Sequence, residues 1–524
     1  METIPSPIGK STAVSLSTTL KICMFATGAA ATATEYTLAT LASYLLGNAI
    51  LQWTMVISLM LFAMGVGSRF SRRLIDHLMD YYVLTELGLS LFCALSALIC
   101  FWASAFTTHS GTAVYFSACA VGFLIGLEVP LVARINERFE TLRINISSVM
   151  EYDYYGALAG GALFGFFFLP VLGLTYTPMV LGGMNWLAGG LILFPFASLT
   201  KRPVLLKLAY FGIGGLILLA AYFAKPIILY GEQHKYKDKI VYEEQTQYQK
   251  IVVTQWKENY WLFLNGSEQF STYDEERYHE PLVHPALSLL KERKDILLLG
   301  GGDGLAAREI LKYADVETLT VVDLDPAMTR LAREHPIFKT INKGALDDPR
   351  TKVISQDAYQ FIENAEQLYD AVIVDLPDPK TVSLSLLYSQ GFYTRVYQHL
   401  KPYGVVVTQS GSPLYSPDAF VCIKKTMEAG GFTIVPFQNS VPTLGRWGWN
   451  IGVKKERMTA KELKDRLNQL EFAGLETRFI NRDAMISMTH FGKGLFEREA
   501  GIEVNTRINH VLTTYYRQGD WDLY

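Results

Sequence analysis

The pattern of hydrophobic positions changes near residue 225. Before that point, apolar runs of about 20 residues follow one another, and a run of that length can cross a bilayer as a helix. About seven such runs are predicted, at residues 20–46, 50–66, 82–103, 112–132, 157–172, 177–197 and 205–223. Small residues such as Gly160, Gly161, Gly182 and Gly183 recur in them and allow membrane helices to approach closely. The sequence therefore predicts a multi-pass α-helical transmembrane bundle over residues 1–224.

In the second part of the chain, apolar and polar residues alternate on a shorter period. Apolar and polar positions alternate between residues 236 and 266, and Asn265-Gly266 is a strong hairpin signal. A small antiparallel β domain is predicted over residues 225–283. From residue 284, strands such as ILLLG (296–300) alternate with helical patterns, which predicts a doubly wound, Rossmann-like α/β domain over residues 284–457. Residues 458–524 form a predicted C-terminal appendage.

Composition excludes several classes of protein. Half of the 524 residues are hydrophobic and 13% are aromatic, which excludes a disordered chain. The formal net charge of −3 excludes a globally basic nucleic-acid binder. Five cysteines without a CxxC pair predict neither a structural zinc site nor a redox motif.

Basic residues in the loops of the apolar half give an orientation. Arg69, Arg134 and Lys201 follow the second, fourth and sixth runs, and the positive-inside rule places such loops in the cytoplasm. Seven crossings would then place the second half of the chain outside the cell.

Candidate chemistry lies at the ends of the predicted parallel strands. GGGDG (300–304) follows a strand and opens a helix, as at many ligand-binding turns, although a turn without a ligand is equally typical. Asp303 in this turn favours a positively charged ligand over a pyrophosphate. Asp323 and Asp357 end the next strands, where they would suit a ribose diol and an adenine amino group. Helix capping is the alternative role for both.

The segment DLPDP (375–379) adds two carboxylates to this edge. Asp375 and Asp378 with Asp303 would form an acidic pocket that attracts a cationic substrate. Clustered carboxylates could also remove a proton from an ammonium group and make the amine nucleophilic. A purely structural turn is the alternative. The strand-end series as a whole resembles the S-adenosylmethionine-dependent methyltransferase superfamily, with its class I fold.

A closer resemblance covers residues 230 to about 455. The motifs LNGSEQF (264–270), DEERYHE (274–280), GGGDG, DLPDP and VPTLGRWGW (441–449) occur in this order. On these motifs the chain resembles the polyamine aminopropyltransferases, the spermidine synthases. GLEVPL (126–131), YDYYGALAG (152–160) and VNTRINH (504–510) resemble the variant of that family that carries a membrane domain.

The resemblance implies a reaction and a set of roles. The donor would be decarboxylated S-adenosylmethionine and the acceptor a diamine such as putrescine. The products would be spermidine and methylthioadenosine, with no metal and no cofactor beyond the donor. Asp375 matches the proton acceptor of the family. The residues that match its substrate-binding positions are Gln249 and Asp323 for the donor, Asp357 and Ala358 for the adenine, and Tyr278, His279, Asp303 and Asp378 for the amine.

The chain also departs from the family pattern. The loop DLPDPKTVSLSLLYS (375–389) lacks the usual Gly-Pro pair and carries Lys380 beside the acids. Asp323 stands where the family usually has Glu, and Ala358 stands where Gly is common.

Two other function classes stay open. One is a small-molecule methyltransferase on the same fold. The other is a membrane polyamine transporter or sensor with a non-catalytic synthase-like domain, because the apolar half contains Glu35, Glu86, Glu128 and Asp153. Acids inside membrane segments are functional candidates by default, and interfacial placement or interhelical hydrogen bonding is the alternative.

The expected partners are the diamine, the donor and the lipid bilayer, without nucleic acid. The resemblance also implies a homodimer or a homotetramer. The expected location is the cell membrane, with the catalytic domain in the cytoplasm because the donor is a cytosolic metabolite. That expectation opposes the orientation that seven crossings give.

Overall fold

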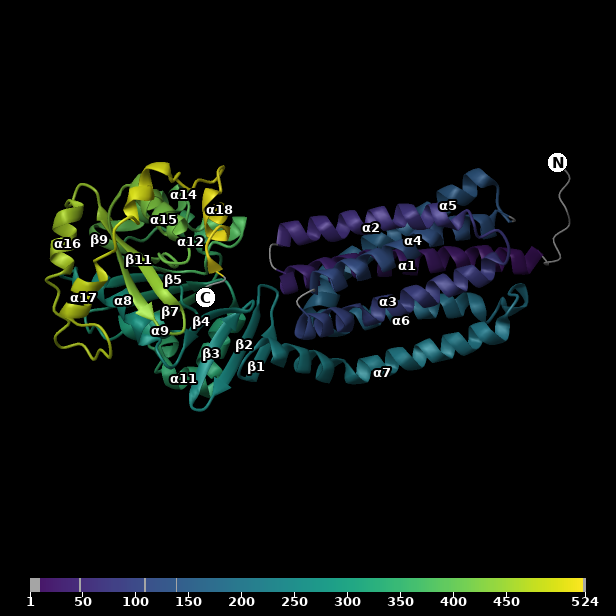
Figure 1. The fold of residues 1–524 in the computed structure, drawn as a ribbon, viewed down its shortest axis with the longest axis horizontal. Coiled ribbons are helices and arrows are strands. Elements are labelled where there is room, and N and C mark those ends of the chain that lie inside the picture. Colours follow the sequence, from purple (N-terminus) through teal and green to yellow (C-terminus); the bar gives the residue numbers. More distant parts are fainter. Residues whose placement is uncertain (1–9, 47–48, 108–109, 138, 522–524) are drawn as a thin grey trace. The chain divides into compact units, whose positions relative to one another are not determined.

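The computed structural model describes residues 10–46, 49–107, 110–137 and 139–521 (Figure 1). The chain divides into two compact units, Met1–Lys239 and Ile240–Tyr524. Each unit is described by itself below. The division into four domains that the sequence suggested stays a prediction.

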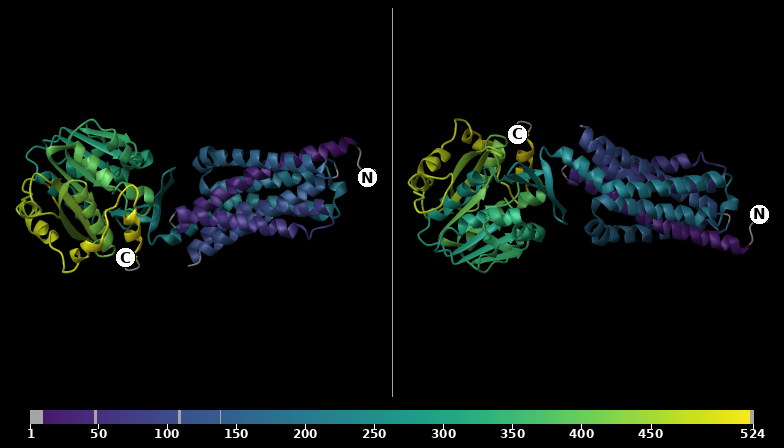
Figure 2. Two further views of the ribbon diagram at one scale, coloured as in Figure 1. Left: turned by 90° about the horizontal axis from the view of Figure 1, so that it is seen from above. Right: turned by 90° about the horizontal axis from the view of Figure 1, so that it is seen from below.

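The first unit is a bundle of long helices. Its described part contains α1 (Lys10–Leu46), α2 (Ala49–Ser71), α3 (Leu78–Phe106), α4 (Ser110–Asn136), α5 (Leu142–Leu163), the π-helix η1 (Phe164–Leu172), α6 (Gly173–Leu193), η2 (Ala197–Leu199) and α7 (Pro203–Lys235). The helices lie side by side along the bundle (Figure 2), and α1 packs against α2, α4, α5 and α6. Gly156 and Gly160 of α5 lie directly on the backbone of α1 at Phe25 and Ala29, where any Cβ atom would collide with a carbonyl oxygen. These glycines therefore allow the close helix approach that small residues provide.

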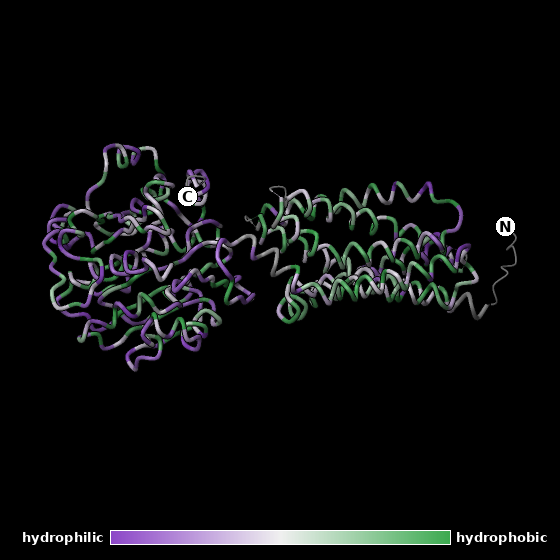
Figure 3. Tube along the Cα trace, turned by 60° about the horizontal axis from the view of Figure 1, so that its bottom comes forward, coloured by the Kyte–Doolittle hydropathy of each residue, from purple (hydrophilic) through white to green (hydrophobic). Residues whose placement is uncertain are grey.

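Each predicted apolar run falls on helical structure, and the hydrophobic residues follow the helices along the bundle (Figure 3). Within the described residues, five ranges are long and apolar enough to cross a membrane. They are Ile50–Ser71, Leu78–Ser104, Gly111–Asn136, Leu142–Leu193 and Pro203–Ile227. The fourth range covers α5, η1 and α6 together. The number of crossings therefore stays a prediction.

The second unit begins with a four-stranded sheet in the order β1-β2-β3-β4. Its strands are β1 (Lys239–Gln245), β2 (Lys250–Trp256), β3 (Asn259–Leu264) and β4 (Ser267–Ser271). Asn265 and Gly266 connect β3 and β4 with positive φ angles of 51° and 78°. Positive φ at both central positions is what the Asn-Gly signal predicts, so the hairpin is confirmed.

A seven-stranded mixed sheet follows, in the order β10-β11-β9-β8-β5-β6-β7. Strands β5 to β9 are parallel, and β10 and β11 form an antiparallel edge. The strands are β5 (Asp295–Gly300), β6 (Thr318–Asp323), β7 (Thr351–Ser355), β8 (Tyr369–Asp375), β9 (Leu400–Gln409), β10 (Phe432–Val441) and β11 (Gly445–Lys454). The predicted doubly wound α/β fold is confirmed.

Helices cover both faces of this sheet (Figure 1). They are α8 (Glu276–Ser288), α9 (Leu305–Ile310), α10 (Pro326–Glu334), α11 (Pro336–Ile341), η3 (Ala345–Asp347), α12 (Ala358–Glu363), α13 (Val382–Leu386), α14 (Gln390–His399), α15 (Pro417–Ala429), α16 (Ala460–Leu467), α17 (Arg482–Met488), η4 (Phe496–Gly501) and α18 (Val511–Arg517). On β5, Ile296 and Leu298 belong to one buried cluster, and Leu297 and Leu299 belong to another. Alternate residues of a strand point to opposite faces, so this apolar strand fills two cores at once.

The order of the strands fixes where a ligand would bind. Strands β5 and β8 are neighbours, and Gly300 pairs with Asp375 at their carboxyl ends. The sheet grows outward from this pair in both directions. Ligands of open α/β sheets bind at such a reversal point, outside the carboxyl ends of the strands.

Candidate active site

The glycine-rich turn after β5 forms the floor of the candidate site. Gly300, Gly301 and Gly304 have φ angles of +83°, +67° and +83°. A Cβ atom at Gly300 would collide with the backbone oxygen of Asp375. Asp303 accepts a hydrogen bond from the backbone N–H of Leu305 at 2.7 Å, and burial raises its pKa. The turn therefore brings Asp303 close to the carboxyl end of β8.

Asp323, at the end of β6, ties two loops together. Its carboxylate accepts hydrogen bonds from the backbone N–H groups of Gly302 and Asp325, each at 3.0 Å. Burial raises the pKa of Asp323 to about 6. A carboxylate has about four lone-pair positions, so two remain for hydroxyl donors. The capping role belongs to its neighbour, because Asp325 accepts from the N–H of Ala327 at the start of α10.

Asp375 ends β8 and is held by a tyrosine. The hydroxyl of Tyr278 on α8 donates a hydrogen bond of 2.8 Å to its Oδ1. The Tyr278 ring lies against Trp449, with ring centroids 5.5 Å apart. Burial raises the pKa of Asp375 to about 6, and the nearby positive charge of His279 acts against that rise. Asp375 is therefore an oriented carboxylate poised to gain or lose a proton near neutral pH.

The charge on His279 depends on Glu275, one helical turn earlier. His279 Nδ1 lies 3.0 Å from a Glu275 oxygen, and both side chains are buried. Burial alone would lower the pKa of His279, but the hydrogen bond and charge of Glu275 raise it to about 9. Burial likewise opposes ionisation of Glu275, yet His279 and Arg308 hold its pKa at about 2. His279 is consequently a buried imidazolium whose charge acts on Asp303 and Asp375.

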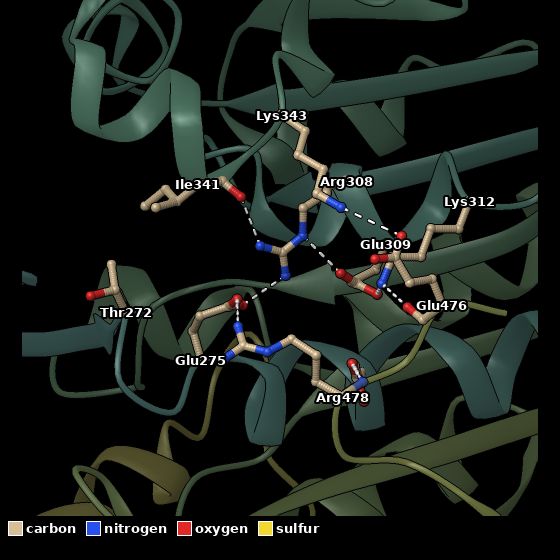
Figure 4. Close-up of a pocket in the computed structure, with 10 residues that line it drawn as sticks. Thr272, Glu275, Arg308, Glu309, Lys312, Ile341, Lys343, Glu476 and Arg478 are labelled. Carbon is tan, nitrogen blue, oxygen red and sulfur yellow. Dashed lines mark hydrogen bonds and ion pairs between the residues drawn. The ribbon is translucent and has the colours of Figure 1, made fainter. Parts of the chain in front are cut away.

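Glu275 also lines a cavity of about 170 Å³ (Figure 4). Its charged walls are neutralised internally: Arg308 bonds to Glu275 and Glu309, at 2.9 and 2.8 Å, and Lys312 pairs with Glu309. These charges already have partners. The ion pairs in the cavity wall therefore fix Glu275, and they give no sign of a ligand.

Asp378 lies in the loop after β8 and is bound by the C-terminal tail. Tyr516 of α18 donates to its Oδ2 at 2.6 Å, and Gln409 at the end of β9 lies 3.3 Å from its Oδ1. Gln409 also donates to the backbone oxygen of Leu376 at 2.7 Å. The backbone before Asp378 is further held by the Tyr388 hydroxyl, which donates to Leu376 at 2.9 Å.

Asn505 of the VNTRINH segment braces the other end of this loop. Its side-chain amide donates to the backbone oxygens of Ser385 and Tyr388, at 2.8 and 3.1 Å. Lys380, the departure that sequence places beside the acids, extends to Ser267 of β4 at 2.6 Å. The loop without a Gly-Pro pair is thus fixed by the tail.

The remaining predicted site residues lie around β6 and β7. Gln249 of the loop before β2 donates to Asp325 at 3.0 Å, next to Asp323. Asp357 caps α12 by accepting from the N–H of Gln360 at 2.9 Å, and Ala358 is the first residue of that helix. The backbone N–H of Gln356 donates to the backbone carbonyl oxygen of Asp323 at 3.1 Å, which joins the two loops.

Comparison with known proteins gives the family. The family model for the spermine/spermidine synthase domain matches residues 275–465. Polyamine aminopropyltransferase 2 of Aquifex aeolicus is 42% identical over 96% of this chain and 99% of its own length. Polyamine aminopropyltransferase 1 of Streptomyces coelicolor is 41% identical over 82% of each chain. This chain belongs to the polyamine aminopropyltransferase family.

Among solved structures, a spermidine synthase in complex with the transition-state analogue AdoDATO has a TM-score of 0.46 and 22% identity. It covers 50% of this chain and 89% of that one. The spermidine synthase from Thermotoga maritima has a TM-score of 0.45 at the same identity and covers 50% and 88%.

Membership of the family covers both units, because the Aquifex relative matches nearly the whole chain. Within the catalytic unit, sequence reasoning did not identify Glu275, Gln409, Asn505 or Tyr516 as part of the site. Glu275 stands four residues before His279, a spacing that places both on one face of a helix and could have revealed the pair. Tyr516 comes from a predicted appendage, and no local pattern connects it with Asp378.

Proposed function

We propose that this protein transfers the aminopropyl group of decarboxylated S-adenosylmethionine to an aliphatic diamine such as putrescine, giving spermidine and methylthioadenosine. The observation that carries the proposal is Asp375. It is an oriented carboxylate with a pKa of about 6, beside Asp303 at the strand reversal of the sheet. Membership of the polyamine aminopropyltransferase family supports the same reaction.

The reaction is a displacement at carbon. The amine nitrogen forms a bond to the aminopropyl carbon, and the bond from that carbon to the sulfonium breaks with its electron pair left on sulfur. The attacking nitrogen must first lose a proton, because an ammonium has no free electron pair. Asp375 would accept that proton, since a carboxyl with a pKa of about 6 is mainly ionised at pH 7.

Electrostatics would place the two cationic substrates. Asp303 and Asp378 would hold the amine or the aminopropyl group, and Tyr278 and His279 would line the same side. His279 is an imidazolium, so it would keep Asp375 ionised more than it would attract an amine. The enzyme then contributes mainly by aligning nitrogen, carbon and sulfur and by accepting the proton.

The nucleoside part of the donor would lie over β6 and β7. Asp323 has lone pairs left for the ribose hydroxyls, and Gln249 lies beside it on Asp325. Asp357 and Ala358 would contact the adenine. The donor has lost its carboxylate, so it avoids repulsion from Asp303. An ordinary methyl donor retains that carboxylate and would be disfavoured.

We further propose that the bundle lies in the cell membrane and that the catalytic unit lies in the cytoplasm, where the donor is made. Basic residues occur at both ends of the bundle: Arg69 and Arg134 lie in the last turns of α2 and α4, Lys201 follows α6, and Lys235 and Lys237 lie at the end of α7. Charge alone therefore leaves the orientation open. A reporter that functions only in the cytoplasm, fused to the C-terminus, is expected to be active. Activity of a reporter that functions only outside the cell would overturn the placement.

The test of the reaction is release of methylthioadenosine by the detergent-purified full-length protein. The assay supplies decarboxylated S-adenosylmethionine with putrescine, cadaverine, agmatine or a longer polyamine. Amine-dependent release is expected, and the best amine names the acceptor. Turnover of S-adenosylmethionine in place of the decarboxylated donor would indicate a methyltransferase. Binding of the donor without release for any amine would contradict the proposal.

A further inference from the structure

Lys380 is a cation at the edge of the candidate site that the proposed mechanism does not use. It follows Asp378 by two residues, and its backbone N–H donates to the Asp378 carbonyl oxygen at 2.7 Å. On its other side, the Thr381 side chain caps α13, and Thr513 of α18 donates to the Thr381 carbonyl oxygen at 3.4 Å. The loop therefore holds the backbone of Lys380 at a fixed place beside Asp378.

Two contacts fix the side chain of Lys380. Its Nζ donates to Oγ of Ser267 on β4 at 2.6 Å. It also lies 6.0 Å from the centre of the Tyr516 ring, and the hydroxyl of Tyr516 donates to Asp378. The same tyrosine therefore lies beside both the ammonium and the carboxylate. This arrangement places the ammonium of Lys380 on the side of the site that would take the amine.

The ammonium of Lys380 has neutral partners. Within the described part of the chain, its Nζ contacts the Ser267 hydroxyl and the Tyr516 ring, and neither carries a charge. Glu268 is the next residue of β4, but successive side chains of a strand point to opposite faces, and Glu268 is hydrogen-bonded to Thr443. The positive charge of Lys380 therefore acts on any cation that enters beside Asp378.

Acceptor amines differ in the number of ammonium groups that they bring to this place. Under the proposed function, a diamine such as putrescine gives one proton to Asp375 and keeps one distant ammonium. A triamine such as spermidine keeps two. Repulsion between like charges is screened less in a partly buried site than in bulk water, so a cation in the wall disfavours the amine with more charges.

We propose that Lys380 determines which class of amine serves as the acceptor: its ammonium repels amines with more than two amino groups and thereby selects diamines. The inference rests on the proposed function and deepens it by naming the acceptor class. The competing explanation is a purely structural tie between the loop and β4. Such a tie would affect all amines alike, whereas repulsion depends on the charge that the amine carries.

The experiment compares kcat/KM for spermidine with kcat/KM for putrescine, by methylthioadenosine release from the detergent-purified full-length protein. Lys380→Met removes the charge and keeps a long, unbranched side chain. The ratio of spermidine to putrescine should rise about tenfold, which is the size expected for one like charge at a partly exposed site. Lys380→Arg retains the charge and should keep the wild-type ratio. Lys352→Met, at an exposed lysine of the edge strand β7, is the matched control.

Salt provides a second readout that a structural tie would not move. Raising the ionic strength from about 0.05 M to about 0.5 M should shift the wild-type ratio toward that of Lys380→Met, because ions screen the repulsion. An equal loss of kcat/KM for both amines in Lys380→Met, with the ratio unchanged, would overturn the proposal and leave the structural tie.

Binding separates this inference from the proposed function. Equilibrium dialysis of labelled putrescine and spermidine, with methylthioadenosine present, measures the same preference without turnover. In Lys380→Met, the Kd for spermidine should fall about tenfold relative to the Kd for putrescine. An unchanged ratio of the two Kd values would overturn the role of Lys380. Absence of methylthioadenosine release with every amine, together with a shifted Kd ratio, would contradict the transfer reaction and support the role of Lys380 in amine selection.

Discussion

Buried carboxylates occur in both units, and their surroundings differ. In the catalytic unit, Glu275 bonds to His279 and Arg308, and Glu309 bonds to His284 and Arg308. In the bundle, the buried neighbours of Glu86 are Tyr82 and Glu128, neither of which is a cation. A buried acid with cationic partners can stay ionised and stabilise the structure around it, whereas a buried acid with only neutral or acidic neighbours has no charge to pair with.

Asp375 lies between these extremes. One of its oxygens accepts from Tyr278, and its pKa of about 6 leaves it able to take up a proton. The comparison teaches that burial alone does not mark a functional acid. The charge of the partners that the fold supplies is the more useful criterion.

The largest expected effect comes from removing the incompletely partnered acid of the catalytic unit. Asp375→Asn keeps the shape of the side chain and removes the proton acceptor, so aminopropyl transfer should fall by about 10²–10⁴-fold. The measurement is methylthioadenosine release at saturating donor and amine. Asp370→Asn, at the other end of the same strand, is the matched control and should keep most of the turnover. Similar losses in both variants would mean that the effect is structural.

The fully partnered acids should affect stability instead. Glu275→Gln removes the carboxylate partner of His279 and one of the two carboxylate partners of Arg308, and breaking a buried pair costs about 3–5 kcal/mol. Chemical denaturation of the full-length protein, followed by the fluorescence of the catalytic unit, measures this loss. Glu276→Gln should cost about 1 kcal/mol or less, because its ion pair with Arg478 is 3.5 Å long and the Arg478 side chain is 62% exposed. A fall of less than about 1 kcal/mol in the free energy of unfolding of Glu275→Gln would contradict the idea that the paired acids of this unit stabilise it.

A smaller effect is expected at the loop that the tail braces. Tyr516→Phe removes the 2.6 Å hydrogen bond to Asp378, and a bond to a charged group is worth about 1.5–3 kcal/mol. The KM for the amine should therefore rise about tenfold or somewhat more, with kcat less affected. Tyr515→Phe is the neighbouring control. An unchanged KM would show that the tail does not position Asp378.

The smallest expected effect is a shift along the pH axis. Glu275 raises the pKa of His279 to about 9, and the resulting positive charge favours ionised Asp375. Without Glu275, His279 is neutral at lower pH, so the pKa of Asp375 should rise. In Glu275→Gln protein that still folds, the acid limb of kcat/KM should accordingly move to higher pH. An acid limb of kcat/KM at the wild-type position would show that the charge of His279 does not influence the ionisation of Asp375.

Much of the fold follows from local pattern. Strand ILLLG, the Asn265-Gly266 turn and the Gly300–Gly304 turn each carry their own signal, so the sheet and its reversal point could be predicted. The strand-end acids Asp303, Asp323 and Asp375 follow from the same reasoning. The contacts of Tyr516 with Asp378 and of Asn505 with the loop span more than 100 residues of sequence, and no periodicity encodes them.

The bundle illustrates the same limit. The sequence shows that Glu86 and Glu128 lie in apolar helices, but only the packing of α1, α3 and α4 shows that Thr27 donates to Glu128 and that Glu86 neighbours Glu128. Partner counts depend on the arrangement of helices, and hydropathy does not contain that information.

The central claim is that Asp375 accepts the proton of the attacking amine. The most direct measurement is the pH dependence of kcat/KM for the diamine with the wild-type protein, between about pH 5 and pH 8. Asp375 must be ionised to act as the acceptor, so the rate constant should rise with pH through about 6 and then level off. A rate constant that does not change across this range would contradict the account.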